Sequence, residues 1–212
     1  MKRILSLCVG LVLAASACTP ASATALYSQA PDFLNAEFSG YALGLPLVVY
    51  DNFTLASDGV INQVDWTGAF NGYGITSFQI SFYSNLLDTP DMLLSTTVIA
   101  GDGNPTLIGP TPFNSFFYSY GTSVDPFTAL AGVEYWMSIV PTGQTDDWGW
   151  ATSSDGDGRG AQSGFIGYSY PLRTYYDNAF TVSNVPEPSS LVFLGTGLLG
   201  VIGAARRRFS IR

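Results

Sequence analysis

The segment of the chain best suited to holding an ion is an acidic, glycine-rich stretch at residues 153–160, which reads Ser-Ser-Asp-Gly-Asp-Gly-Arg-Gly. Closely spaced carboxylates on such a loop can converge on calcium. As an EF-hand loop starting at Asp155, however, it would place Arg159 and a later isoleucine at positions that require oxygen ligands. A calcium loop of another kind, assisted by Asp146 and Asp147, stays open beside the simpler interpretation of a solvated acidic turn.

A second candidate site is the aromatic run Asp-Asp-Trp-Gly-Trp that ends at Trp150. Indole faces can stack on sugar rings while neighbouring polar groups bind hydroxyls. Residues two apart in an extended segment share one side, so Trp148 and Trp150 should face the same way. We therefore take Trp148 and Trp150 as a candidate carbohydrate-contacting edge, against the alternative that they belong to a β-sandwich core.

Several residue types on which enzymes depend are missing. The chain has no His, its only Lys is Lys2, and Cys8 and Cys18 both lie near the N-terminus. The usual general base, the commonest metal ligand and the Schiff-base amine are therefore absent. A glycosidase pair would have to be drawn from Glu37, Glu134 and the aspartates, and no spacing selects one. We expect no enzyme, no catalytic residues and no cofactor, with calcium the one ion to consider.

The middle of the chain is strongly acidic. Residues 26–184 hold 13 Asp and 2 Glu against only Arg159 and Arg173. Such a domain repels nucleic-acid phosphates and anionic headgroups, so nucleic-acid binding is not expected. Neutral polysaccharide or divalent cations suit it better. Without cysteines in this region, stability must come from packing or bound ions rather than from disulfides.

The elements that would position these residues are short strands separated by Gly, Pro and Asn. Apolar and polar residues alternate over residues 77–83, where Phe78, Ile80 and Phe82 share one side, and no long segment shows helical periodicity. This pattern favours an all-β fold, a single β-sandwich of jelly-roll type. The predicted strands are residues 60–66, 77–83, 93–100, 133–140 and 178–183.

The N-terminus has the layout of a secretory signal peptide. Lys2 and Arg3 precede an apolar stretch over residues 4–17, and small residues ending at Ala23 or Ala25 provide two cleavage sites. A buried first helix is the simpler alternative, and a lipoprotein signal at Cys18 fits poorly because Ala15 stands where a lipobox carries Leu. We expect residues 1–25 to be removed by signal peptidase after export through the Sec machinery.

The C-terminus combines three features in a fixed order. The strip Val185-Pro186-Glu187-Pro188 interrupts secondary structure, since proline removes a backbone donor and pushes the preceding residue into an extended conformation. Residues 189–205 then contain no charge and no proline, about 25 Å as a helix and just long enough to cross a bilayer. Three arginines follow, of the kind that holds a helix end in the cytoplasm: Arg206, Arg207 and Arg208.

This order of strip, apolar span and arginine cluster resembles the PEP-CTERM sorting signal, which exosortase-type membrane proteases recognise in Gram-negative bacteria that make exopolysaccharide. The resemblance implies that Val185, Pro186, Glu187 and Pro188 form the recognition strip, that residues 191–205 form a transient inner-membrane helix, and that the arginines stop transfer. An ordinary tail anchor behind a proline-rich linker is the alternative. Short words between Asp51-Asn52-Phe53 and Asp177-Asn178 also resemble the ectodomains common in PEP-CTERM proteins.

Three regions follow from these observations: a signal peptide at 1–25, a β-sandwich ectodomain at 26–184 and the sorting signal at 185–212, with a transmembrane helix. We expect a non-enzymatic protein that an exosortase passes to the cell surface or the medium, where it associates with the exopolysaccharide matrix of a biofilm. A lectin-like, calcium-dependent carbohydrate-binding module is the alternative. A secreted hydrolase that uses carboxylates is a further one.

Overall fold

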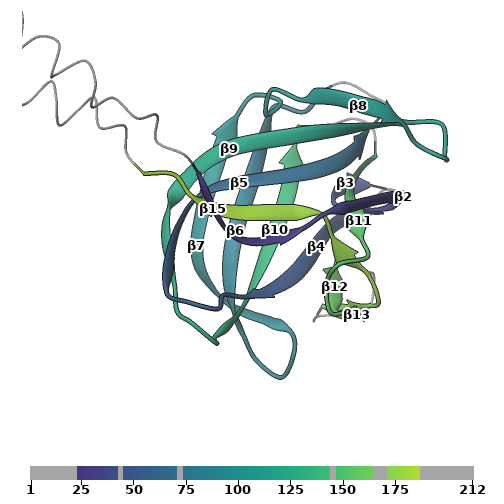
Figure 1. The fold of residues 1–212 in the computed structure, drawn as a ribbon. Coiled ribbons are helices and arrows are strands. Elements are labelled where there is room, and N and C mark those ends of the chain that lie inside the picture. The colour runs from purple at the N-terminus through teal and green to yellow at the C-terminus, as the bar shows by residue number, and fades with distance from the viewer. Residues whose placement is uncertain (1–22, 43–44, 71–73, 144–146, 165–170, 187–212) are drawn as a thin grey trace, which may run out of the picture. The chain divides into compact units, whose positions relative to one another are not determined.

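Two antiparallel β-sheets make up the part of the chain that the computed structural model describes, which is residues 23–42, 45–70, 74–143, 147–164 and 171–186. They form one unit, Thr24–Asn184. Figure 1 shows β5, β9 and β15 in one layer, with β4, β6 and β10 behind them. The predicted all-β class is confirmed, and two sheets around a shared core are the arrangement of a β-sandwich.

The first sheet has eight strands in the order β1-β15-β5-β11-β14, with β2 on β11, β9 on β5 and β8 on β9. Every pairing in it is antiparallel. Its members are β1 (Thr24–Gln29), β2 (Pro31–Phe38), β5 (Gly59–Phe70), β8 (Thr106–Pro110), β9 (Phe116–Ala129), β11 (Trp148–Ser153), β14 (Asp177–Asn178) and β15 (Phe180–Asn184).

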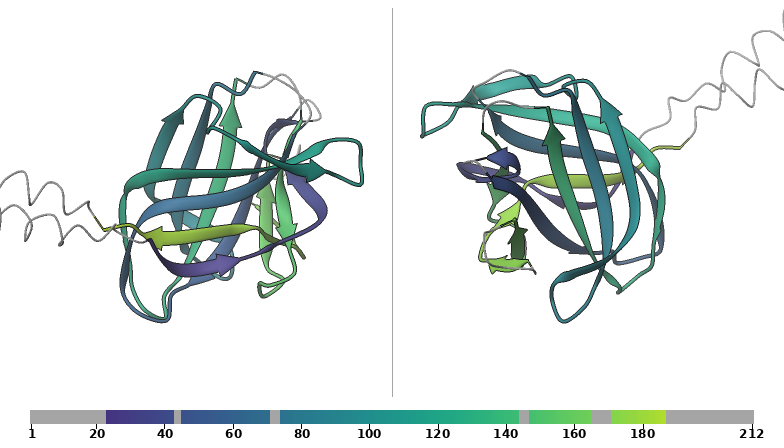
Figure 2. Two further views of the ribbon diagram at one scale, coloured as in Figure 1. Left: turned by 45° about the horizontal axis from the view of Figure 1, so that its top comes forward. Right: turned by 180° about the vertical axis from the view of Figure 1, so that it is seen from behind.

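The second sheet has seven strands in the order β13-β12-β4-β10-β6-β7, with β3 on β4. The right-hand view of Figure 2 shows the molecule from this side. Its members are β3 (Gly40–Ala42), β4 (Leu45–Thr54), β6 (Ser77–Asn85), β7 (Pro90–Ala100), β10 (Glu134–Thr142), β12 (Gly160–Ser163) and β13 (Leu172–Thr174).

The core lies between the sheets and is rich in aromatic rings. Phe82 of β6 stacks on Phe127 of β9, with ring centroids 4.6 Å apart, and Phe78 of β6 meets Trp66 of β5 edge-on at 5.3 Å. The alternation predicted for β6 is confirmed, because Phe78, Ile80 and Phe82 are buried. Aromatic pairs of this geometry stabilise the fold beyond the area they bury.

All five predicted strands are present, the last of them divided by Ala179 into β14 and β15. Strand β9, the longest in the described chain, was not predicted, because Gly121 and Pro126 interrupt its pattern. Within the described ranges no helix is long and apolar enough to span a bilayer. The predicted signal peptide up to residue 22 and the predicted sorting helix at residues 191–205 lie outside them.

Candidate functional site

Strand β11 carries the two tryptophans that the sequence suggested as a carbohydrate edge, and both point into the core. Trp148 and Trp150 are each 0% exposed. Trp148 packs edge-on against Phe78 with ring centroids 5.6 Å apart, and the indole N–H of Trp150 donates to the carbonyl of Ala179 at 2.9 Å. Neither ring face is open to a sugar, so the prediction of a carbohydrate edge at Trp148 and Trp150 is wrong.

The opposite side of the same strand carries only small residues. Because alternate residues of a strand face opposite ways, Gly149 and Ala151 lie on the outer face of the first sheet. Gly149 is opposite Ala69 of β5 and Phe38 of β2 in the ladder. A Cβ added at Gly149 would lie 2.8 Å from the Cβ of Ala36, so the strand requires a glycine there. Small side chains therefore leave a depression on this face.

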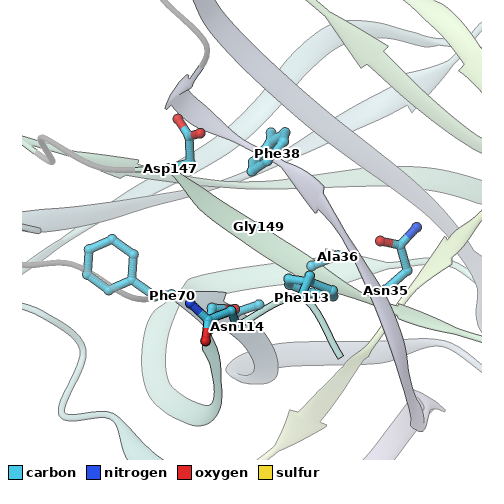
Figure 3. Close-up of a pocket in the computed structure, with 10 residues that line it drawn as sticks. Asn35, Ala36, Phe38, Phe70, Phe113, Asn114, Asp147 and Gly149 are labelled. Carbon is cyan, nitrogen blue, oxygen red and sulfur yellow. The ribbon is translucent and has the colours of Figure 1, made fainter. Parts of the chain in front are cut away.

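The depression is a pocket of about 670 Å³, within the size range of small-ligand sites. Figure 3 shows Gly149 in the middle of the lining residues, with Phe38 and Asp147 on one side and Phe113 and Asn114 on the other. The remaining lining residues are Asn35, Ala36, Ala69, Phe70 and Ser115. The described lining thus combines exposed aromatic rings, two amides, a hydroxyl and one carboxylate.

One wall of the pocket is the turn between β8 and β9, and Thr111 holds that turn in place. The hydroxyl of Thr111 accepts from the N–H of Ser115 at 2.9 Å and from the N–H of Phe113 at 3.3 Å. The N–H of Thr111 donates to the carbonyl of Ser115 at 2.9 Å. Asn114 has φ of 64°, a conformation that Asn tolerates better than most residues. Phe113 and Asn114 are therefore presented on a fixed loop.

The carboxylates of the acidic loop at residues 153–160, which the sequence suggested as calcium ligands, accept hydrogen bonds from other parts of the protein. The carboxylate of Asp155 accepts from the N–H of Ala30 at 3.1 Å. The carboxylate of Asp157 accepts from the guanidinium of Arg159 and, at 3.0 Å, from the amide of Asn52. Within the described ranges no three His, Cys, Asp or Glu side chains gather as a metal site, and Asp146 lies outside those ranges.

Arg159 supplies positive charge to this loop and to two other segments. Its guanidinium is 2.5 Å from Asp157, 2.6 Å from Glu134 and 3.1 Å from Asp88. Partial burial raises the pKa of Asp157, but the hydrogen bonds from Arg159 and Asn52 outweigh it and hold that pKa below its usual value. The arginine that breaks the EF-hand pattern thus neutralises Asp157, one of the two loop carboxylates that an ion would need.

Three acids that the sequence alone did not bring together, Glu37, Asp51 and Asp177, interact electrostatically in the fold. Asp51 of β4 is fully buried, and Asp177 of β14 is 5% exposed. Asp177 accepts from the N–H of Gly158 at 2.8 Å. Burial raises the pKa of Asp51 well above its usual value, and burial raises the pKa of Glu37 in β2 to about 7. The repeated Asp-Asn pairs at 51–52 and 177–178 were the available sequence signal.

The described chain reaches only the first two residues of the predicted recognition strip. Val185 is half-buried and Pro186 exposed, while Glu187, Pro188, Arg206, Arg207 and Arg208 lie outside the described residues. The model of the PEP-CTERM protein-sorting motif matches residues 184–208, which include the whole strip and the arginines.

The chain is a PEP-CTERM sorting domain-containing protein. This sorting signal implies that the PEP-CTERM protein is exported, passes through a membrane-anchored stage and is processed by an exosortase, a membrane protease. The resemblance stated for residues 185–208 is confirmed. No curated protein matches the chain.

Proposed function

We propose that this PEP-CTERM protein is a non-catalytic component of the extracellular exopolysaccharide matrix, delivered there when an exosortase cuts its tail. Signal peptidase and the Sec machinery begin the export, and the apolar span holds the protein briefly in the inner membrane of a Gram-negative cell. Cleavage then leaves the β-sandwich at the cell surface or in the medium.

The observation that carries this proposal is the junction between domain and sorting motif. Strand β15 ends at Asn184, and the matched motif begins at Asn184. β15 lies between β1 and β5, so the chain is held in the sheet up to that residue. A protease acting at the proline strip therefore cuts directly behind a finished fold, and the released product is the β-sandwich itself.

The arrangement of the acids favours a binding or structural role over hydrolysis. A carboxylate pair for glycoside hydrolysis must flank one sugar bond in an open site. Glu134 is tied to Arg159 at 2.6 Å and to the amide of Asn52 at 2.8 Å. Glu37 lies between Ala36 and Phe38, which line the pocket, and alternation along β2 directs Glu37 to the other side. Asp147 is the carboxylate among the described pocket residues.

The test uses the native host and the sorting signal alone. Pro186, Glu187 and Pro188 are replaced by alanine in one variant, and Arg206, Arg207 and Arg208 by glutamine in another. Both should keep the uncut mass. The first should stay in the membrane fraction because it lacks the recognition strip, whereas the second should no longer be held there because it lacks the stop-transfer charge. As a control, Arg159→Gln alters an arginine of the domain and should still be cut. Unchanged mass and location of both tail variants would contradict the proposal.

A second candidate, a carbohydrate-binding module, is favoured by the outer-face pocket. The acidic loop gives little reason to make such binding calcium-dependent, because its carboxylates already meet Arg159, Asn52 and backbone N–H groups. The two candidates are compatible, since matrix association requires some contact with the matrix.

A further inference from the structure

We propose that the outer-face pocket around Gly149 binds an uncharged sugar residue of a polysaccharide chain. The inference rests on the proposed matrix function for its biological setting, but its chemistry follows from the pocket. Three properties support it: apolar aromatic rings, two amide side chains and the absence of positive charge among the described lining residues.

The apolar faces come from two phenylalanines on opposite walls. Phe38 is 37% exposed and Phe113 is 47% exposed, so each offers a ring edge or face to solvent. Phe113 is supported from below by Phe117, with ring centroids 6.2 Å apart, and by the Thr111 turn. A sugar ring presents C–H groups on its faces, and an aromatic ring covers those groups at a small cost in side-chain entropy.

The groups that could bind ligand hydroxyls are side chains, because the backbone N–H and C=O groups of β11 at the pocket floor are already paired with neighbouring strands. Gly149 is paired on both sides, with Phe38 of β2 and with Ala69 of β5. Ligand hydroxyls must therefore meet Asn35, Asn114, Ser115 and Asp147 at the rim. The side-chain amide of Asn114 can both donate and accept, as vicinal hydroxyls require.

Charge separates sugars from other small ligands. The described lining has one carboxylate, Asp147, and no Arg or Lys, in a domain whose only cations are Arg159 and Arg173. A phosphate, a uronic acid or a nucleotide would meet an unfavourable field. A purely apolar ligand would leave the rim amides without partners. A neutral sugar can place its C–H groups against the phenylalanine rings and its hydroxyls against the amides. Because Gly149 has no side chain, the sugar ring can approach the strand backbone.

The test measures binding to the mature full chain by isothermal titration calorimetry. The probes are cellohexaose, laminarihexaose and mannohexaose, with hexagalacturonate as the anionic comparison, and affinity electrophoresis tests exopolysaccharide purified from the host. Phe113→Ala should weaken binding about five- to tenfold, since it removes one stacking face. Asn114→Gly should weaken it by a similar factor while keeping the positive φ. Phe113→Tyr should retain binding.

Tyr175→Ala is the matched control, because Tyr175 is an aromatic residue 89% exposed and outside the pocket. It should bind like the unaltered protein, and all four variants should keep the melting temperature to within a few degrees. Equal affinity of Phe113→Ala, Asn114→Gly and Tyr175→Ala would overturn the proposal, as would tighter binding of hexagalacturonate. No binding of any neutral probe or of the exopolysaccharide would also overturn it. Correct cleavage and location in those variants would show that the sorting function stands independently.

Discussion

Asp51 of β4 accepts a hydrogen bond from the backbone N–H of Asn178 of β14 at 2.5 Å, and this bond joins the two sheets through a fully buried carboxylate. Its other oxygen accepts from the N–H of Asn52 at 2.8 Å. Both donors are backbone N–H groups of buried residues. Without the carboxylate of Asp51 they would lack this hydrogen-bond acceptor in the core.

Removing this carboxylate should therefore destabilise the fold strongly. Asp51→Ala leaves two buried N–H groups without an acceptor and opens a cavity, which together cost about 3 kcal/mol in the free energy of unfolding. Asp58→Ala is the control, because the exposed carboxylate of Asp58 also accepts a backbone N–H, from Ala131 at 2.7 Å. It should cost less than about 1 kcal/mol. Equal losses in urea unfolding would contradict the role given to Asp51.

The buried acids predict a pH dependence of a particular sign. Burial raises the pKa of Glu37 to about 7 from an ordinary 4.5, and the nearby charge of Asp177 adds to the rise. The folded state thus holds this proton more tightly than the unfolded chain. The contribution of Glu37 to stability is complete below about pH 4.5, falls as the pH rises to about 7, and is level above that.

Glu37→Gln should remove this part of the pH dependence, because glutamine resembles the protonated acid and does not titrate. Unfolding free energies measured from pH 4 to pH 8 should converge for the two proteins at the acid end and separate toward pH 8 by roughly 3 kcal/mol, with the variant more stable. Asp51, whose pKa is raised in the same direction, leaves a residual slope in both. Parallel curves would show that Glu37 keeps its ordinary pKa.

Calcium should leave the stability of the domain unchanged. The carboxylate of Asp157 is 2.5 Å from the guanidinium of Arg159, which already supplies the charge an ion would bring. We expect the same melting temperature with millimolar calcium and with a chelator. Arg159→Gln should lower it slightly, since ion pairs this exposed contribute about 1 kcal/mol or less. A clear rise in the melting temperature of the unaltered protein with calcium would contradict this expectation and support a calcium site in the acidic loop.

The two sides of β11 should respond differently to substitution. Trp150→Ala removes a fully buried ring and its bond to Ala179, and should cost about 3–5 kcal/mol of unfolding free energy. Phe113→Ala in the pocket wall should cost less than about 1 kcal/mol, because that ring is half-exposed. Similar losses measured by urea unfolding would mean that the assignment of faces is wrong.

These contrasts indicate what the sequence could predict. Strand β6 was predicted with the correct inner face because its polar and apolar residues alternate. Phe78, Ile80 and Phe82 share one side, and only the core could bury them. The run Trp148-Gly149-Trp150 alternates as clearly, but a large and a small residue do not say which side meets the core. That choice depends on Gly68 of β5, where a Cβ would lie 2.5 Å from the ring of Trp148.

The outer-face pocket had still less sequence signal. Its residues come from β2, β5, β11, the residue before β11 and the turn before β9, so only the sheet order brings them together. Its floor is formed by small side chains. In a sequence, glycine or alanine within a strand pattern is usually interpreted as a sign of a less stable strand and not as room for a ligand. The sorting motif, by contrast, is continuous in sequence and was recognisable without any fold.

The mass of the mature protein in its native host tests the account most directly. Intact-mass spectrometry of material from the surface and the medium should give a chain that begins after Ala23 or Ala25 and ends near Pro188. Such a chain retains the whole β-sandwich through Asn184 and lacks Arg206, Arg207 and Arg208. A mature protein that still carries these three arginines would contradict processing at the sorting motif.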